Sequence, residues 1–110
     1  MKKSALFVVI AAAVIFCFSQ TLLSEDKKPA TGEEIFNKFC SVCHPNGGNV
    51  FKPKEDLSKA SLEAHNIFKP EDIVKVMRNP GPLMTKFDTN TISDKDAMLV
   101  AEYILKKYNK

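Results

Sequence analysis

After the first thirty residues, apolar side chains recur every three or four positions, which is the spacing of amphipathic helices rather than of strands. This pattern predicts an all-α domain with about four short helices. Thr31 and Glu34 form a capping box that begins the first helix, Pro70 begins the third, and Ser93 begins a second capping box before the last. A short helical pattern within residues 53–66 supplies the second helix.

The predicted helices have recognisable ends and one apolar face each. The first is expected to run to residue 41 or 42, the third must end at Asn79–Pro80, and the last is expected to reach about Lys107. The expected inward residues share an apolar body at helical spacing: Ile35, Phe36, Phe39, Leu57, Ala60, Leu62, Ile73, Val74, Val76, Met77, Ala97, Val100, Ala101, Ile104 and Tyr108. Together these faces predict one small core.

Residues 1–24 have a different pattern, that of a targeting segment. Two lysines precede a run of 14 apolar residues, from Ala5 to Phe18, as in the hydrophobic region of a signal peptide. We expect cleavage of this peptide, but two alternatives stay open. The apolar stretch can be extended to Leu23, long enough for a retained membrane anchor, and Cys17 offers a position for a lipid. Each route predicts a periplasmic or otherwise extracytoplasmic location, with or without an anchor.

Residues 25–31 are polar, charged and interrupted by a proline, as a linker is, and residues 32–110 then form a single domain. The whole chain has a net charge of +3, and two of its lysines belong to the leader, so the mature domain is near +1 (3 − 2). Its lysines are interleaved with acids, as on an ordinary solvated surface, and nothing favours nucleic acid as a partner. A domain this small has room for only a modest core, which a bound apolar group would complete.

Cys40, Cys43 and His44 form a C-x-x-C-H motif, the attachment signature of a c-type haem. Two thiols at this spacing lie on one side of a helical turn, where they can add to the two vinyl groups of a haem as thioethers. The histidine that follows is then held beneath the ring as a ligand of the iron. The motif therefore predicts one covalently bound haem c, around which the rest of the domain is wrapped.

Other interpretations of the cysteine pair account for less of the sequence. A structural zinc site needs four ligands, and beyond the motif only His65 and Cys17 are available. A thioredoxin-like redox pair needs a strand–helix–strand context, which the pattern lacks. A structural disulfide across so short a loop gives no role to the adjacent histidine.

A second iron ligand is predicted in residues 80–87. Two prolines and a glycine exclude a helix there and stiffen the loop, which suits Met84 as a thioether held at bonding distance from iron. The rival methionines are better suited to packing, since Met77 lies in mid-helix and Met98 in the first turn of the last helix. His65, at a helix end, stays open as a less favoured ligand.

Taken together, these residues resemble the small monohaem class I c-type cytochromes, most closely the soluble photosynthetic type that can replace plastocyanin, and its bacterial relatives. The similarity runs from about Gly32 to Tyr108, and the matching features are Gly32 and Phe36, the haem motif, residues 47–50, residues 57–62, residues 84–87, and residues 92–104 with Tyr103. The resemblance implies the cytochrome c fold, with N- and C-terminal helices packed together around one covalent haem. It also implies His44 and Met84 as axial ligands.

The sequence departs from the family pattern at three places. Thr85 replaces the usual proline after the methionine, and residues 88–91 replace a glycine-glycine-arginine stretch, so any docking role of that arginine is not carried over. Val76 and Met77 occupy the region where some members have a glutamine. A photosynthetic role is therefore not implied, whereas the fold and mechanism of the family are.

The resemblance implies a single-electron carrier rather than an enzyme, exchanging electrons with larger redox proteins in transient contacts. With His44 and Met84 both on the iron, no position stays open for a substrate. The alternative is gas binding, sensing or a minor peroxidase activity through a labile sixth position, which Thr85 would favour. A fixed relay tethered to a membrane complex is a third hypothesis, and a monomer is the default oligomeric state.

Overall fold

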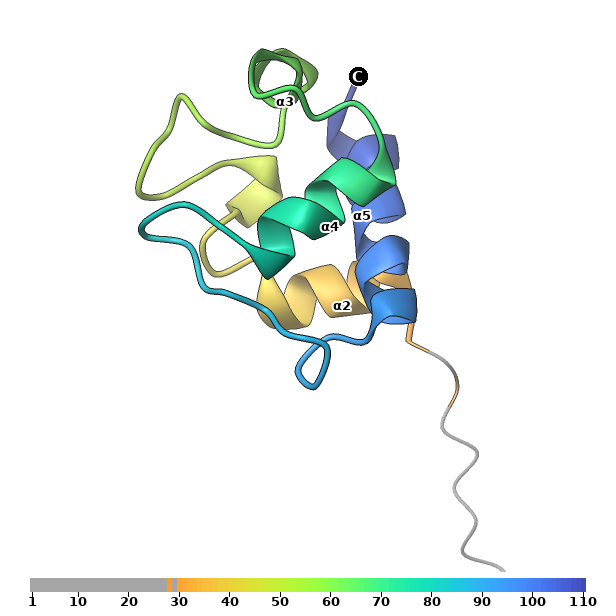
Figure 1. The fold of residues 1–110 in the computed structure, drawn as a ribbon. Coiled ribbons are helices and arrows are strands. Elements are labelled where there is room, and N and C mark those ends of the chain that lie inside the picture. The colour runs from red at the N-terminus through yellow and green to blue at the C-terminus, as the bar shows by residue number, and fades with distance from the viewer. Residues whose placement is uncertain (1–27, 29) are drawn as a thin grey trace, which may run out of the picture.

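The computed structural model describes residue 28 and residues 30–110, so the predictions on the leader, residues 1–24, lie outside the described residues. In chain order the elements are α2 (Gly32–Phe39), the 3₁₀ helix η2 (Pro45–Gly47), α3 (Lys59–Ala64), α4 (Pro70–Arg78) and α5 (Asp94–Tyr108) (Figure 1). The described part of the chain has no strand, which confirms the all-α prediction. No helix within it is long and apolar enough to cross a membrane.

The first and last of these helices, α2 and α5, pack against each other, and α4 also packs against α5 (Figure 1). The predicted packing of the N- and C-terminal helices is therefore confirmed. Ten buried residues form one core: Ile35, Phe36, Ile73, Met77, Phe87, Ile92, Ala97, Val100, Ala101 and Ile104. Most of the predicted inward residues are in this set or packed against it, because helical spacing places them on the faces that meet.

Gly32 and Phe36 determine how closely α2 approaches α5. A Cβ atom on Gly32 would collide with the carbonyl oxygen of Leu99 and lie 2.8 Å from the Cβ of Tyr103. One turn later, Phe36 is buried, and its ring centroid lies 5.5 Å from the centroids of both Tyr103 and Tyr108. The absence of a side chain at Gly32 and the aromatic cluster around Phe36 together determine how closely α2 and α5 pack.

Hydrogen bonds at the helix starts bear out the capping signals. The Thr31 N–H donates to Glu34 Oε2 at 2.8 Å, and the Glu34 N–H donates to Thr31 Oγ1 at 3.2 Å. The Thr31 backbone bond, more than any other cause, holds the pKa of the Glu34 carboxyl below its ordinary value. At α5, Ser93 Oγ accepts from the Asp96 N–H at 3.1 Å, which is the serine half of the predicted box.

Two sequence predictions about the helices are wrong in detail. The helix α2 ends at Phe39 instead of residue 41 or 42, because the Ser41 N–H donates to Phe36 O, one residue further back than a helical bond would reach. Ala60 is exposed rather than inward. It lies in the first turn of a six-residue helix in which Leu62 is the buried residue, so that helix has too few turns to present a wide apolar face.

Replacing Gly32 with alanine should destabilise the holoprotein. Gly32→Ala is expected to lower the free energy of unfolding by about 1–3 kcal/mol, the usual cost of overpacking a well-packed contact. The measurement is a denaturant titration followed by circular dichroism. Glu102→Ala is the control, because Glu102 is exposed on the same helix α5 and lies away from the contact with α2. Equal losses in the two variants would contradict the close contact between α2 and α5.

Candidate haem-binding site

The motif cysteines lie in a tight turn directly after α2. Cys40 is the C-cap residue of that helix, and its carbonyl oxygen accepts from the N–H groups of Cys43 at 3.1 Å and His44 at 2.9 Å. All three side chains are half-buried and line one cavity. The two thiols are not joined by a disulfide, so both are available to a group inside that cavity.

The ring of His44 is oriented by the turn that follows it. In η2, Asn46 and Gly47 have φ angles of 53° and 79°, and this left-handed pair bends the chain back toward the histidine. The carbonyl oxygen of Gly48 then lies 2.7 Å from His44 Nδ1. Because a carbonyl can only accept, Nδ1 carries the proton and Nε2 keeps its lone pair for a metal.

A cavity of about 430 Å³ opens beside the motif, within the range of about 300–1,000 Å³ that is usual for cofactor sites. Its apolar lining includes Leu57, Leu62, Ile67, Ile73, Phe87 and Ile104. Cys40, Cys43, His44 and Met84 all line it as well. Residues 79–87 form the loop that carries Met84, called the Met84 loop below. The fold therefore brings this loop and the haem motif, which are far apart in the sequence, to the same cavity.

Asn49 holds the loop that forms one wall of the cavity. Its Oδ1 accepts from the N–H groups of Phe51 at 3.1 Å and Lys52 at 2.9 Å, and its Nδ2 donates to Glu55 O at 2.9 Å. These four residues all line the cavity. The sequence places Asn49 in a turn, but its role as an anchor depends on where Glu55 comes to lie.

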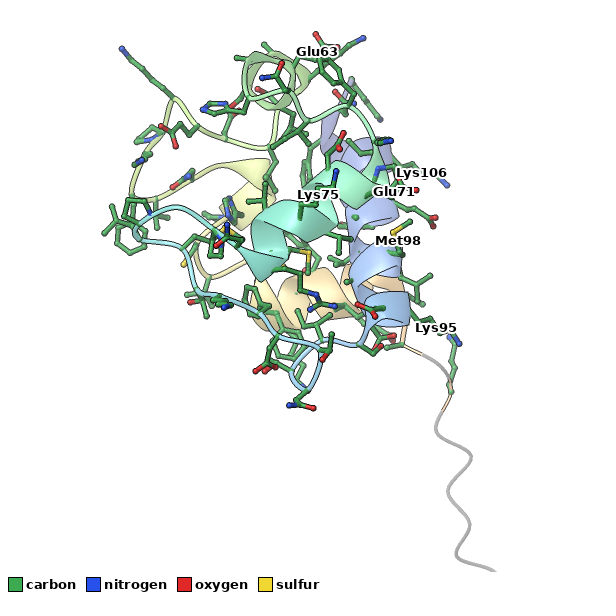
Figure 2. The ribbon with its side chains drawn as sticks, in the orientation of Figure 1. Glu63, Glu71, Lys75, Lys95, Met98 and Lys106 are labelled. Carbon is green, nitrogen blue, oxygen red and sulfur yellow. The ribbon has the colours of Figure 1, made fainter. Side chains whose placement is uncertain are left out.

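Met84 shares the cavity with two of its three rivals. It is half-buried and lines the cavity, as do Met77 and His65. Met77 is 3% exposed and belongs to the helical core, whereas His65 is exposed and its Nδ1 donates to Ser61 O at 2.8 Å. Met98 does not line the cavity, and its side chain lies on the outer side of α5 (Figure 2).

Arg78 is a residue that the sequence alone does not single out. It is the last residue of α4, and its guanidinium donates to Phe87 O at 3.1 Å and to Asp94 Oδ1 at 2.8 Å. The only signal in the sequence is an arginine just before a proline-rich loop. Its two acceptors follow 9 and 16 residues later, so only the fold identifies them.

The donor set fits a haem and does not fit a structural zinc ion. Within residues 28 and 30–110, no group of three or more His, Cys, Asp or Glu side chains could hold a metal ion. Burial, with the neighbouring Cys43 as a smaller cause, raises the pKa of the Cys40 thiol to about 11, so the thiol is protonated at neutral pH when no group is bound to it. Two thiols at the edge of an apolar cavity, with an imidazole whose Nε2 is free, are the groups that covalent haem attachment uses.

An all-α fold wrapped round such a cavity is that of a c-type cytochrome, and comparisons with known proteins agree. The family model described as cytochrome c oxidase, cbb3-type, subunit III matches residues 27–104. Cytochrome c6 of Cyanidium caldarium is 33% identical over 105 residues, covering 94% of each chain. Cytochrome c6 of Cyanidioschyzon merolae is 33% identical over 110 residues, covering all of this chain and 98% of the relative.

Solved structures of similar sequence have the same fold. OmcF, the outer membrane cytochrome F of Geobacter sulfurreducens, superposes with a TM-score of 0.69 at 38% identity, covering 70% of this chain and 98% of that one. Cytochrome c6 of the diatom Phaeodactylum tricornutum gives 0.64 at 31% identity, covering 68% and 87%. The chain therefore belongs to the cytochrome family whose family model matches residues 27–104. It is a small class I c-type cytochrome of the c6 type. It binds one haem c covalently and is a monohaem electron carrier.

Removing the Asn49 amide should loosen the cavity wall. Asn49→Ala deletes three hydrogen bonds of one loop, and we expect the free energy of unfolding of the holoprotein to fall by about 1–3 kcal/mol. Denaturant titration followed by haem absorbance and by circular dichroism measures this. Asn90→Ala is the control, because Asn90 is exposed and only its backbone N–H is bonded, to Asp88. Equal losses would show that the Asn49 bonds carry no net stability.

Proposed function

We propose that Cys40 and Cys43 hold the haem as thioethers and that His44 and Met84 bind its iron from its two sides. The observation that carries the proposal is the shared cavity, which all four side chains line although they come from two distant segments. The haem, when bound, supplies an iron that accepts and releases one electron. The role of the chain is to hold that iron, select its ligands and keep water away from it.

His44 is suited to the first axial position by its hydrogen bond to Gly48. The bond fixes the tautomer and the ring plane, and it increases the basicity of Nε2. Met84 is suited to the second position because a thioether is neutral and favours reduced iron, which raises the potential relative to two histidines. With both positions filled by side chains, no ligand position remains for a substrate, so the proposed protein transfers electrons and catalyses no reaction of its own.

The proposed partners are larger redox proteins outside the cytoplasm, met one at a time in transient contacts. A signal-like leader supports the location, and OmcF, a relative by structure, is named as an outer membrane cytochrome. Contacts of this kind bury little area and separate quickly, which suits a monomer with a near-neutral mature domain. The mass of the mature N-terminal peptide would show whether the leader is removed, retained as a tether or replaced by a lipid.

One observation favours a second candidate, in which the sixth position is labile and binds small gases or peroxide. Leu83, directly before Met84, has a φ of 74°, a left-handed conformation that costs a non-glycine residue about 1–2 kcal/mol. Thr85, in place of a proline, follows Met84 and is exposed. Strain beside a ligand would help that ligand to leave, and it is the feature that a sensing function would use.

The optical spectrum of the oxidised holoprotein separates the two candidates. Methionine bound to ferric haem gives a weak far-red band, which we expect to observe. Its presence would support a closed site and electron transfer. Its absence would favour His65 or an open position, and binding or sensing would replace electron transfer as the proposed function.

Loss of His44 should be the most damaging change at the site. His44→Ala is expected to reduce the yield of stable holoprotein by about tenfold or more, since iron ligation and folding are coupled. Haem content per polypeptide after purification measures this. His65→Ala should leave the yield unchanged. A normal yield of six-coordinate holoprotein from the His44 variant would contradict its assignment.

Loss of Met84 should open the iron without releasing the haem. Met84→Ala is expected to retain the covalent haem, lose the far-red band and bind cyanide when oxidised and carbon monoxide when reduced, because the thioether no longer blocks the metal. Absorbance titrations measure both. Met98→Ala, on the outer side of α5, is the matched control and should behave like the wild type (Figure 2). Unchanged access of these ligands in the Met84 variant would show that another residue binds the iron.

A further inference from the structure

The guanidinium of Arg78 connects three parts of the molecule. Its side chain, at the end of α4, is only 22% exposed. Nη1 donates to Phe87 O at the end of the Met84 loop, and Nη2 donates to Asp94 Oδ1 in the first turn of α5. One charged group thus connects the end of α4, where the Met84 loop begins, with the end of that loop at Phe87 and with the first turn of α5.

The loop that carries Met84 has few other polar anchors. Within the described part of the chain, residues 80–86 neither donate nor accept any hydrogen bond. Two of them are prolines, which have no N–H to donate. The loop is therefore held at its two ends, where the Asn79 N–H donates to Lys75 O and the Phe87 N–H donates to Met77 O, both at 2.9 Å.

Phe87 is the anchor nearest to Met84 on the C-terminal side, and it is fixed in three ways. Its N–H is bonded to Met77 O, its carbonyl oxygen accepts from Arg78, and its ring is buried. The ring meets Phe39 edge to face, with centroids 6.0 Å apart. Phe39 directly precedes the first haem cysteine, so the end of the Met84 loop is packed against the segment that holds the haem.

Asp94 has a different part in the arrangement. Its side chain is 83% exposed, so its ion pair with Arg78 contributes little stability by itself. The carboxylate lies at the start of α5 and the guanidinium at the end of α4, and each charge is favourable at its helix end. The role left to the pair is to orient the guanidinium toward the carbonyl oxygen of Phe87, the less exposed of its two partners.

We propose that Arg78 is a positioning residue for the axial methionine, and that it keeps Met84 on the iron by closing the loop 79–87 at its base. The proposal rests on the proposed His44 and Met84 ligation. Without the guanidinium, the Phe87 carbonyl loses its partner, and that end of the loop keeps one hydrogen bond, from the Phe87 N–H to Met77 O, and the packing of the Phe87 ring. The strained backbone at Leu83 then favours departure of the Met84 sulfur.

The test is Arg78→Met in the oxidised holoprotein, with imidazole as the external ligand. Methionine keeps an unbranched apolar stem but has no donor. We expect imidazole to bind about tenfold faster than in the wild type, because a charged hydrogen bond that held the loop closed is lost. Stopped-flow absorbance measures the rate of imidazole binding. The measurement is made without denaturant, after circular dichroism has shown that the wild type and Arg78→Met are both folded. On heating, the far-red band of Arg78→Met should also disappear at a lower temperature than the band of the wild type.

Lys75→Met is the matched control. It makes the same type of change on the same helix, at a lysine whose side chain is 78% exposed and whose ion pair is with Asp72, away from the Met84 loop. Its imidazole rate should equal that of the wild type. Asp94→Ala keeps the guanidinium and removes only its orienting partner, so it should increase the rate by less than Arg78→Met. This variant also tests the proposal if the arginine variant does not fold.

Three outcomes would overturn the proposal, and they differ in what else they remove. A wild type without the far-red band overturns the His44 and Met84 ligation, and the role of Arg78 with it. A wild type with the band, and unchanged imidazole rates in Arg78→Met and Asp94→Ala, overturns the role of Arg78 alone. A lower unfolding midpoint with an unchanged imidazole rate would also overturn it, because Arg78 would then stabilise the fold without positioning the methionine.

Discussion

Packing around the haem that we propose for the cavity beside Cys40 and Cys43 is the interaction on which the rest of this domain depends. The core made by α2, α4 and α5 consists of few side chains, and Leu57, Ile67 and Met84 are only partly buried against it. These three residues also line the cavity, where a bound haem would cover their remaining apolar surface. Because each Å² of apolar surface removed from water contributes about 25 cal/mol, a large covalent macrocycle supplies core that so short a chain lacks.

The two sides of the site are built by different kinds of contact. The side with the cysteines is local: the turn at Cys40 and the bond from His44 to Gly48 are completed within nine residues of chain. The methionine side depends on distant contacts, because the Met84 loop is held by α4, by Phe39 and by the start of α5. In the proposed ligation, Met84 would therefore respond to changes far from the iron, whereas His44 would respond mainly to changes in its own turn.

This division bears on the proposed function. An electron carrier needs a sixth ligand that stays bound in both oxidation states, yet the loop here has a left-handed Leu83 and no hydrogen bonds between residues 80 and 86 within the described chain. Rigidity must then come from the prolines and from the two ends of the loop. The bonds at Phe87 hold the C-terminal end of the loop, and in our proposal they offset the strain next to Met84.

The sequence by itself determined the helix starts, most of the core positions, the haem motif and the family. Each of these depends on short-range rules: a capping box spans four residues, an amphipathic face has a fixed period, and the motif requires five consecutive positions. Only the tertiary structure decided that Met77 and His65 share a cavity with Met84, that Asn49 holds a wall, and where Arg78 binds. Those contacts join residues whose separation follows from helix packing, and no local pattern encodes it.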